Sequence, residues 1–233
     1  MKDRGQPTDA PPVADERVYA RQVDLLYQHA PLAIATTLVN GLLLAVVQRH
    51  HIAPGTLTLW FALLVLVMAG RGLLAYGYAR VRPALPSPRL WGRYYVAAMA
   101  LSGAVWGSAA VALFPAHTVG HQVFVAFVLA GMTAGAVVLA APLRQATLCF
   151  AAAALLPLAA QFFIQGGELA TAMGIMTLLF FAVVMVSAQR VHRLILDTLR
   201  LDLSNRDLEA RLEMEKQFVA AVVDIADTLM LVL

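Results

Sequence analysis

Arg71 is the side chain of this sequence best suited to bind a polar ligand, because it lies in a long apolar stretch without acidic residues. Ionisable residues inside such stretches are rare and commonly mark functional sites. Asn40 and Trp106 also lie in apolar stretches, and a buried indole N–H requires a partner. We therefore predict Asn40, Arg71 and Trp106 as ligand-binding residues, with an Arg71–Asn40 hydrogen bond. In the alternative, Arg71 extends to the cytoplasmic headgroups and Trp106 only fills the interior.

A second polar group is expected at the opposite end of the molecule. It consists of His50, His51, His117, His121 and Glu168. Imidazole and carboxylate groups can bind a divalent metal, and imidazole titrates near neutral pH. No three of these residues have a recognised ligand spacing, so the sequence predicts no metal site and leaves a pH-sensing role open.

The sequence contains no set of residues that indicates catalysis. Cys149 is the only cysteine and lies in an apolar stretch, so no intrachain disulfide or redox pair is available. No nucleophile–base pair or metal triad can be recognised. We predict neither a catalytic residue nor a cofactor for this chain.

The composition indicates a membrane protein that crosses the bilayer several times. Of the 233 residues, 61% are hydrophobic and 13% are charged, with a mean hydropathy of +0.74, whereas a soluble domain carries about 25% charged residues. A net charge of +3 does not indicate a nucleic-acid partner, and lipids are the expected surroundings.

Six stretches have the roughly 20 apolar residues that a transmembrane helix requires. They comprise residues 31–47, 57–78, 94–114, 122–141, 146–164 and 169–188. We expect an all-α bundle of six transmembrane helices over residues 31–189. Residues 1–30 precede it as a cytoplasmic segment, with a short helix over 17–30 lying in the membrane interface. That helix would turn Val18, Val23, Leu25 and Leu26 toward lipid.

The basic residues predict the orientation of the bundle. With the N-terminus in the cytoplasm, 15 of the 17 Lys and Arg residues lie in cytoplasmic segments, Arg49 lies outside and Arg71 lies within a span. Such a bias favours two cytoplasmic termini. By the rise of an α-helix, Arg71 lies about 12 Å from the inner boundary, and Asn40 lies at a similar depth.

Small residues are expected to bring neighbouring spans together. Gly103 and Gly107 lie four residues apart, as do Gly131 and Gly135, and such pairs allow close helix packing in membranes. Pro157 is expected to kink the fifth span, with the carbonyl that it frees accepting a hydrogen bond from a neighbour instead.

The segment 190–227 is predicted to form a cytoplasmic coiled coil. Apolar residues recur there at intervals of three and four, and an Asn at one core position favours a parallel dimer. The repeat consists of Val191, Leu194, Thr198, Leu201, Asn205, Leu208 and Leu212. We predict a homodimer through Leu194, Leu201, Asn205, Leu208 and Leu212. The alternative is an amphipathic helix packed on another domain.

The last residues, 228–233, form an apolar run after this charged segment. A free cytoplasmic terminus would expose this run to water without any gain. We therefore expect residues 228–233 to be the first strand of a soluble domain that continues beyond the chain.

The chain resembles the N-terminal six-span membrane region of bacterial signalling proteins that continue with PAS domains and then diguanylate cyclase (GGDEF), phosphodiesterase (EAL) or histidine kinase domains. The similarity involves DLLYQHAPLAIATTLVNGLLLAVV (24–47), the spaced Trp60, Arg71 and Tyr78, SGAVWGSAAVALFP (102–115) and FVLAGMTAGAVVLAAP (127–142). The segment EKQFVAAVVDIADTLMLVL (215–233) looks like the linker helix and first strand of a PAS domain.

This resemblance implies a sensory input module in the bacterial inner membrane, with a lipophilic small molecule or a membrane state as its stimulus. The module would control a cytoplasmic output enzyme, with cyclic-di-GMP turnover preferred and a histidine kinase next. The alternatives are a small transporter or channel, and a passive membrane anchor that dimerises its enzyme. Between Asp24 and Asp197 the only acidic residue is Glu168, which argues against an ion-coupled carrier because such carriers usually need buried carboxylates.

Overall fold

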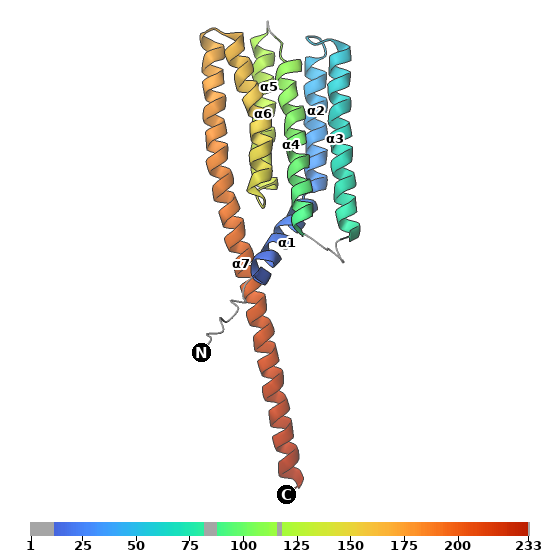
Figure 1. The fold of residues 1–233 in the computed structure, drawn as a ribbon, viewed down its shortest axis with the longest axis vertical. Coiled ribbons are helices and arrows are strands. Elements are labelled where there is room, and N and C mark those ends of the chain that lie inside the picture. The colour runs from blue at the N-terminus through green and yellow to red at the C-terminus, as the bar shows by residue number, and fades with distance from the viewer. Residues whose placement is uncertain (1–11, 82–87, 116–117, 233) are drawn as a thin grey trace, which may run out of the picture. The chain divides into compact units, whose positions relative to one another are not determined.

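The computed structural model describes residues 12–81, 88–115 and 118–232, and the regular structure of these residues is entirely helical. Figure 1 shows the order of the helices along the chain. They are α1 (Pro12–Gln28), α2 (Ala30–Gln48), α3 (Pro54–Val81), α4 (Pro88–Ala112), α5 (Val119–Leu139), α6 (Arg144–Gln165) and α7 (Glu168–Val232). The chain divides into two compact units, Met1–Ile195 and Leu196–Leu233.

Six helical segments are long and apolar enough to cross a membrane, as the hydropathy pattern predicted. The first segment, Glu16–Gln48, consists of most of α1 together with α2. Helices α3, α4, α5 and α6 provide the next four segments, and the part of α7 up to Gln217 is the last. Each of the six exposes large apolar side chains, the pattern expected of a surface that faces lipid rather than water. Examples are Leu43, Leu66, Leu101, Val138, Ile164 and Met176.

Helix α4 is the best-buried span and contacts α1, α3, α5 and α6. Its closest neighbour is α6, because Gly103 and Gly107 lie against the α6 backbone. A Cβ atom on Gly103 would lie 2.7 Å from the Phe150 carbonyl oxygen, and one on Gly107 would lie 2.0 Å from the Ala153 oxygen. The prediction that this glycine pair permits close helix packing is therefore confirmed.

Pro157 explains why the contact between α4 and α6 includes the Ala153 carbonyl. Proline has no N–H, so Pro157 leaves the carbonyl four residues earlier, that of Ala153, without its helical donor. Pro157 lies inside α6, and its ring also approaches Gly107, with Cγ 3.2 Å from the position of an added Cβ. The glycine thus brings the α4 backbone close to the carbonyl that the proline frees, whereas the kink and a new donor for this carbonyl stay predictions.

The second glycine pair, on α5, does not mediate packing, contrary to the prediction. A Cβ atom on Gly131 or Gly135 would meet no atom within 4 Å. Both residues are exposed and line a cavity, so their lack of a side chain leaves space open. The four-residue spacing alone does not distinguish glycines that pack against a neighbouring helix from glycines that border a cavity.

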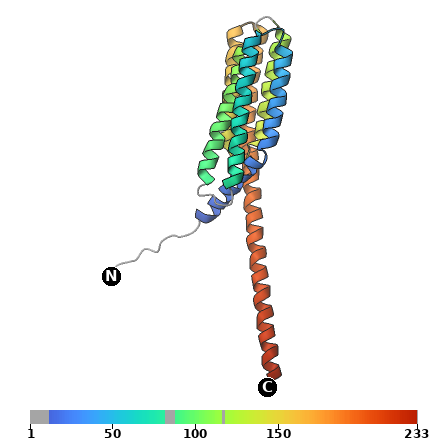
Figure 2. The ribbon, with the colours of Figure 1, turned by 90° about the vertical axis from the view of Figure 1, so that its right-hand side faces the viewer.

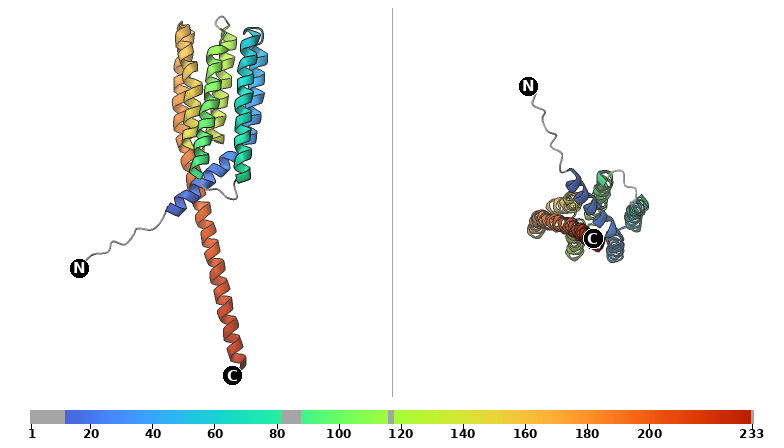
Figure 3. Two further views of the ribbon diagram at one scale, coloured as in Figure 1. Left: turned by 45° about the vertical axis from the view of Figure 1, so that its right-hand side comes forward. Right: turned by 90° about the horizontal axis from the view of Figure 1, so that it is seen from below.

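Helix α1 lies across one end of the bundle, as both views in Figure 3 show. The expected helix is present, but its apolar side chains do not face outward. Val18, Val23 and Leu26 are buried, Leu25 is half-buried, and Val23 and Leu26 belong to the main hydrophobic core. The amide of Gln22 also donates to the Pro142 carbonyl at 2.7 Å. The apolar face of α1 is therefore covered by protein.

The bundle part of α7, residues 168–195, runs beside the other spans (Figure 2) but is the least buried of them. Val184 packs on Val137 of α5 and Ala151 of α6. A ring nitrogen of His192 lies 3.1 Å from the Ala141 carbonyl oxygen. Since few side chains fix α7, its tilt or rotation should cost less than that of α4.

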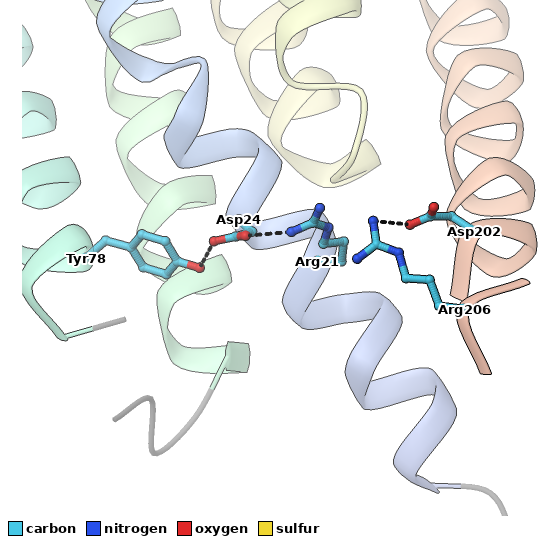
Figure 4. Close-up of polar contacts among 5 residues, drawn as sticks. All are labelled: Arg21, Asp24, Tyr78, Asp202 and Arg206. Atoms are coloured by element: carbon cyan, nitrogen blue, oxygen red, sulfur yellow. Dashed lines mark hydrogen bonds and ion pairs between the residues drawn. The ribbon is translucent and has the colours of Figure 1, made fainter. Parts of the chain in front are cut away.

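The second unit, residues 196–233, consists of the remainder of α7. The strand predicted for residues 228–233 is not observed, because the helix continues through Val232 and Leu233 lies outside the described residues. A lone strand has no partner for its N–H and C=O groups, whereas a helix satisfies them internally. Asp202 and Arg206 form an ion pair at 3.2 Å on the helix surface (Figure 4).

Candidate functional site

A cavity of about 270 Å³ lies within the first unit. Helices α2 and α5 provide most of its lining residues, and α3, α4 and α6 provide the others. Arg71 and Asn40 both line it, so the structure brings together two of the three predicted ligand-binding residues. Most of the wall is apolar. It includes Tyr95 and Met99 from α4, Phe127, Val128 and Met132 from α5, and Phe150 from α6.

Arg71 is 7% exposed and therefore does not extend to the surface of the bundle. Its Nη1 donates to Ser102 Oγ at 3.4 Å, a long hydrogen bond, and its guanidinium lies 5.9 Å from the centre of the Tyr95 ring. Nη2 has no hydrogen-bond partner, and no ion pair involves Arg71 among the described residues. A buried cation without a counter-ion is costly, so this site is suited to an anion.

Asn40 does not form the predicted hydrogen bond to Arg71. Its Nδ2 instead donates to the Thr36 carbonyl at 3.0 Å, one turn earlier on α2. Short polar side chains commonly hydrogen-bond to their own helix in this way. The Asn40 amide thus lines the same cavity as the guanidinium without neutralising or orienting it.

Trp106, the third predicted residue, does not line this cavity. Its side chain is fully buried and packs edge-on against Trp60 of α3, with ring centroids 5.6 Å apart. Trp60 donates to the Val105 carbonyl at 3.0 Å, whereas Trp106 Nε1 has no hydrogen-bond partner among the described residues. In this structure Trp106 fills the core, the alternative that the sequence left open.

Tyr95 and Ser102 are parts of the site that we did not predict. Both contact Arg71, and each lies one turn of α4 from Met99 on the same face, Tyr95 before it and Ser102 after it. A spacing of three and four residues was the available signal. This spacing did not lead to a prediction, because Tyr and Ser are common in apolar helices and neither side chain is as unusual there as Arg71.

A cluster of aromatic side chains next to this site connects α1 to α3 and α4. The Tyr27 and Tyr78 rings are stacked at 4.1 Å, and the Tyr27 ring meets that of Tyr95 edge-on at 5.5 Å. Tyr27 donates to the Trp91 carbonyl, and Tyr78 donates to the Asp24 carboxylate, both at 3.1 Å.

Asp24 anchors α1 at the edge of this cluster (Figure 4). The carboxylate accepts from Tyr78 and pairs with Arg21 at 3.3 Å, and the residue is only 7% exposed. No role was predicted for Asp24, because an acidic residue in an amphipathic helix is ordinarily exposed to solvent.

The polar group at the other end of the bundle is only partly assembled. The His51 and His121 rings lie 3.8 Å apart, and Arg49 donates to a ring nitrogen of His50 at 3.0 Å. His117 lies outside the described residues. Within the described ranges, no three His, Cys, Asp or Glu side chains are arranged to hold a metal ion.

The predicted dimer residues lie on α7. Leu201, Asn205, Leu208 and Leu212 are all exposed, and the leucines expose 49–65% of their surface. Leu194, in the first unit, is 65% exposed. The face that the heptad pattern defines is therefore accessible on the chain.

Comparison of this chain with protein-family models, curated proteins and solved structures yielded no match. The fold and the cavity define a helical protein with six segments able to span a membrane and a buried arginine among them.

Proposed function

We propose that this chain is a membrane-embedded sensory input module that controls a cytoplasmic output domain through a dimeric exit helix. The observation that carries the proposal is the extent of α7. One helix, Glu168–Val232, begins as a span of the bundle and ends as a charged segment with an exposed leucine repeat. Movement of such a helix in the bundle is passed to whatever follows it in the chain.

The proposed location is the bacterial inner membrane, with both termini in the cytoplasm. Basic residues support this orientation, because they gather at the α1 end of the bundle and favour the cytoplasmic side. Arg80 ends α3, Arg89 and Arg93 begin α4, and Arg144 begins α6. At the other end, Arg49 follows α2.

The proposed mechanism uses the loose packing of α7 in the bundle. A stimulus shifts a conformational equilibrium only when it binds one state more tightly than the other. The cavity beside Arg71 supplies a place for a lipophilic stimulus, and α7 supplies the element that moves at least cost. The output is proposed to be cyclic-di-GMP turnover, with a histidine kinase second, on the resemblance alone. No enzymatic activity is proposed for the chain itself.

The proposal is tested by fusing residues 1–233 to a diguanylate cyclase reporter domain. A matched fusion replaces residues 12–189 by six unrelated spans and keeps the exit helix. We expect regulated activity only with the native spans. Equal activity and equal regulation in both fusions would instead identify a passive anchor that dimerises its enzyme.

A small carrier is the second candidate function, because the same cavity would also suit a transported solute. The carboxylate of Asp24 gives a carrier one buried acidic group, although its burial was not predicted. Flux of an organic anion into liposomes that contain this chain, lost in Arg71→Gln, would favour the carrier over the sensor.

A further inference from the structure

We infer that the Arg71 cavity binds a single-chain amphiphile with a carboxylate head, such as a medium-chain fatty acid. The assignment rests on the proposed sensory function, because it names the stimulus that the bundle detects. It is argued from charge, hydrogen bonding, size and access.

The charge of the site requires an anion. Arg71 is buried and forms no ion pair among the described residues, and its hydrogen bond to Ser102 is long. The Nη2 atom has no partner although the side chain lines the cavity. A carboxylate in the cavity would supply the missing charge, and a shift of the buried guanidinium toward it would also give Nη2 an acceptor, in the planar geometry that Arg and carboxylate share.

The remaining polar groups of the cavity fit the same head group. The Asn40 amide and the Thr36 and Thr37 hydroxyls line the cavity on α2. The two hydroxyls donate their protons to backbone oxygens at 2.9 and 2.7 Å. The Asn40 Nδ2 donates one N–H to the Thr36 carbonyl at 3.0 Å and keeps a second N–H for a head group, so Asn40 can assist Arg71, which supplies the charge.

The volume and the walls indicate a short apolar chain. An apolar cavity of about 150 Å³ holds benzene. In proportion, the 270 Å³ observed here would hold about 11 non-hydrogen atoms, a size that octanoate matches. The α5 wall of Phe127, Val128 and Met132 offers no polar side chain to a ligand with a second charged end.

Access to the cavity is from the side of the bundle. Thr36 on α2 and Phe127, Gly131 and Gly135 on α5 line the cavity and are exposed, and Phe127 is 75% exposed. These positions lie within the spans, so in a membrane they face acyl chains rather than water. An amphiphile already dissolved in the bilayer reaches the site, and a hydrophilic anion such as inorganic phosphate does not.

The test is photolabelling of the full chain in phosphatidylcholine nanodiscs with a diazirine derivative of octanoic acid, followed by mapping of the labelled residues. We expect labelling on α2 and α5 that octanoate displaces and that methyl octanoate or octylamine does not. Arg71→Gln should reduce this labelling by about tenfold or more, and Arg71→Lys should retain part of it.

A second pair of variants tests the opening and does not depend on Arg71. Gly131→Leu with Gly135→Leu should block labelling, because these residues line the cavity and leave space for a side chain. Gly70→Leu with Gly120→Leu is the matched control. These glycines also have no neighbour within 4 Å, do not line the cavity and are exposed, so labelling should be unchanged.

Three results would overturn the assignment. They are equal labelling in wild type and Arg71→Gln, equal displacement by the methyl ester, and loss of labelling when phosphatidylglycerol replaces part of the lipid. The last result would assign the site to a phospholipid phosphate. Failure of the proposed function has a different signature, since octanoate would then label the cavity as expected without changing the activity of the reporter fusion.

Discussion

At the scale of single residues, Gly107 determines how closely α4 and α6 approach. The space that a Cβ atom would occupy is already filled by the Ala153 carbonyl oxygen, a backbone atom that cannot rotate away. Gly131 has the same residue type and the same four-residue spacing to another glycine, yet borders open space. The two positions therefore provide a matched pair for measuring the energy of this contact.

Gly107→Ala should lower the stability of the bundle by about 1–3 kcal/mol, the usual cost of overpacking. Gly131→Ala should leave stability within about 0.5 kcal/mol of the wild type, as is usual for an exposed position. Thermal unfolding in detergent micelles measures both. Equal effects of the two substitutions would contradict the packing described for α4 and α6.

Tyr78→Phe should destabilise the attachment of α1, because it removes the hydroxyl that donates to the buried Asp24 carboxylate. The expected loss is about 1–3 kcal/mol, the cost of leaving a buried polar group short of a partner. Tyr76→Phe is the control, since Tyr76 lies on the same helix and is 57% exposed. Limited proteolysis of α1 and thermal unfolding should change only in Tyr78→Phe.

At the level of residues, the sequence was sufficient to bring Arg71 and Asn40 to one cavity, while their role in ligand binding stays a prediction. Arg71 stands out because a charge inside an apolar stretch is rare, and Asn40 was placed beside it by depth. The hydrogen bonds of these residues were not predictable, because several acceptors lie within reach and only packing selects Thr36 for Asn40 and Ser102 for Arg71. Asp24 was missed because burial of α1 depends on contacts with distant segments.

At the scale of helices, length and hydropathy were sufficient to predict six helical segments able to span a membrane, since a bilayer of fixed thickness would impose both. The predicted strand at residues 228–233 depended instead on partners outside this chain, and the structure is helical up to Val232. Helix propensity and self-contained hydrogen bonding determine the outcome where no second strand is available.

We predict that regulation depends on the phase of the leucine repeat in α7, which insertions into this helix can change. Inserting one complete heptad after Arg200 keeps the phase of the leucine repeat, whereas inserting about half a heptad rotates it. In the diguanylate cyclase fusion, the full heptad should preserve regulation and the half heptad should fix the activity high or low. If both insertions leave the regulation of the reporter unchanged, transmission through a rigid paired helix is excluded.

At the scale of the whole molecule, the basic residues make a prediction about orientation. In a Cys149→Ala background, Gly55→Cys and Gly120→Cys should react with a membrane-impermeant maleimide added to intact cells. Arg89→Cys on α4 and Arg144→Cys on α6, at the opposite end of the bundle, should react only after the membrane is opened. All four positions are exposed on the chain, so access depends on the membrane alone. The opposite labelling pattern would invert the proposed topology.

Cysteine cross-linking of α7 in native membranes tests the central claim, a paired exit helix, most directly. In the Cys149→Ala background, Leu201→Cys and Leu208→Cys should form disulfide-linked dimers, because core heptad positions bring two Cα atoms within about 7 Å. Arg200→Cys and Arg206→Cys, exposed on other faces of the helix, should remain largely monomeric. Absence of dimers at Leu201 and Leu208, or equal yields at all four positions, would contradict the account.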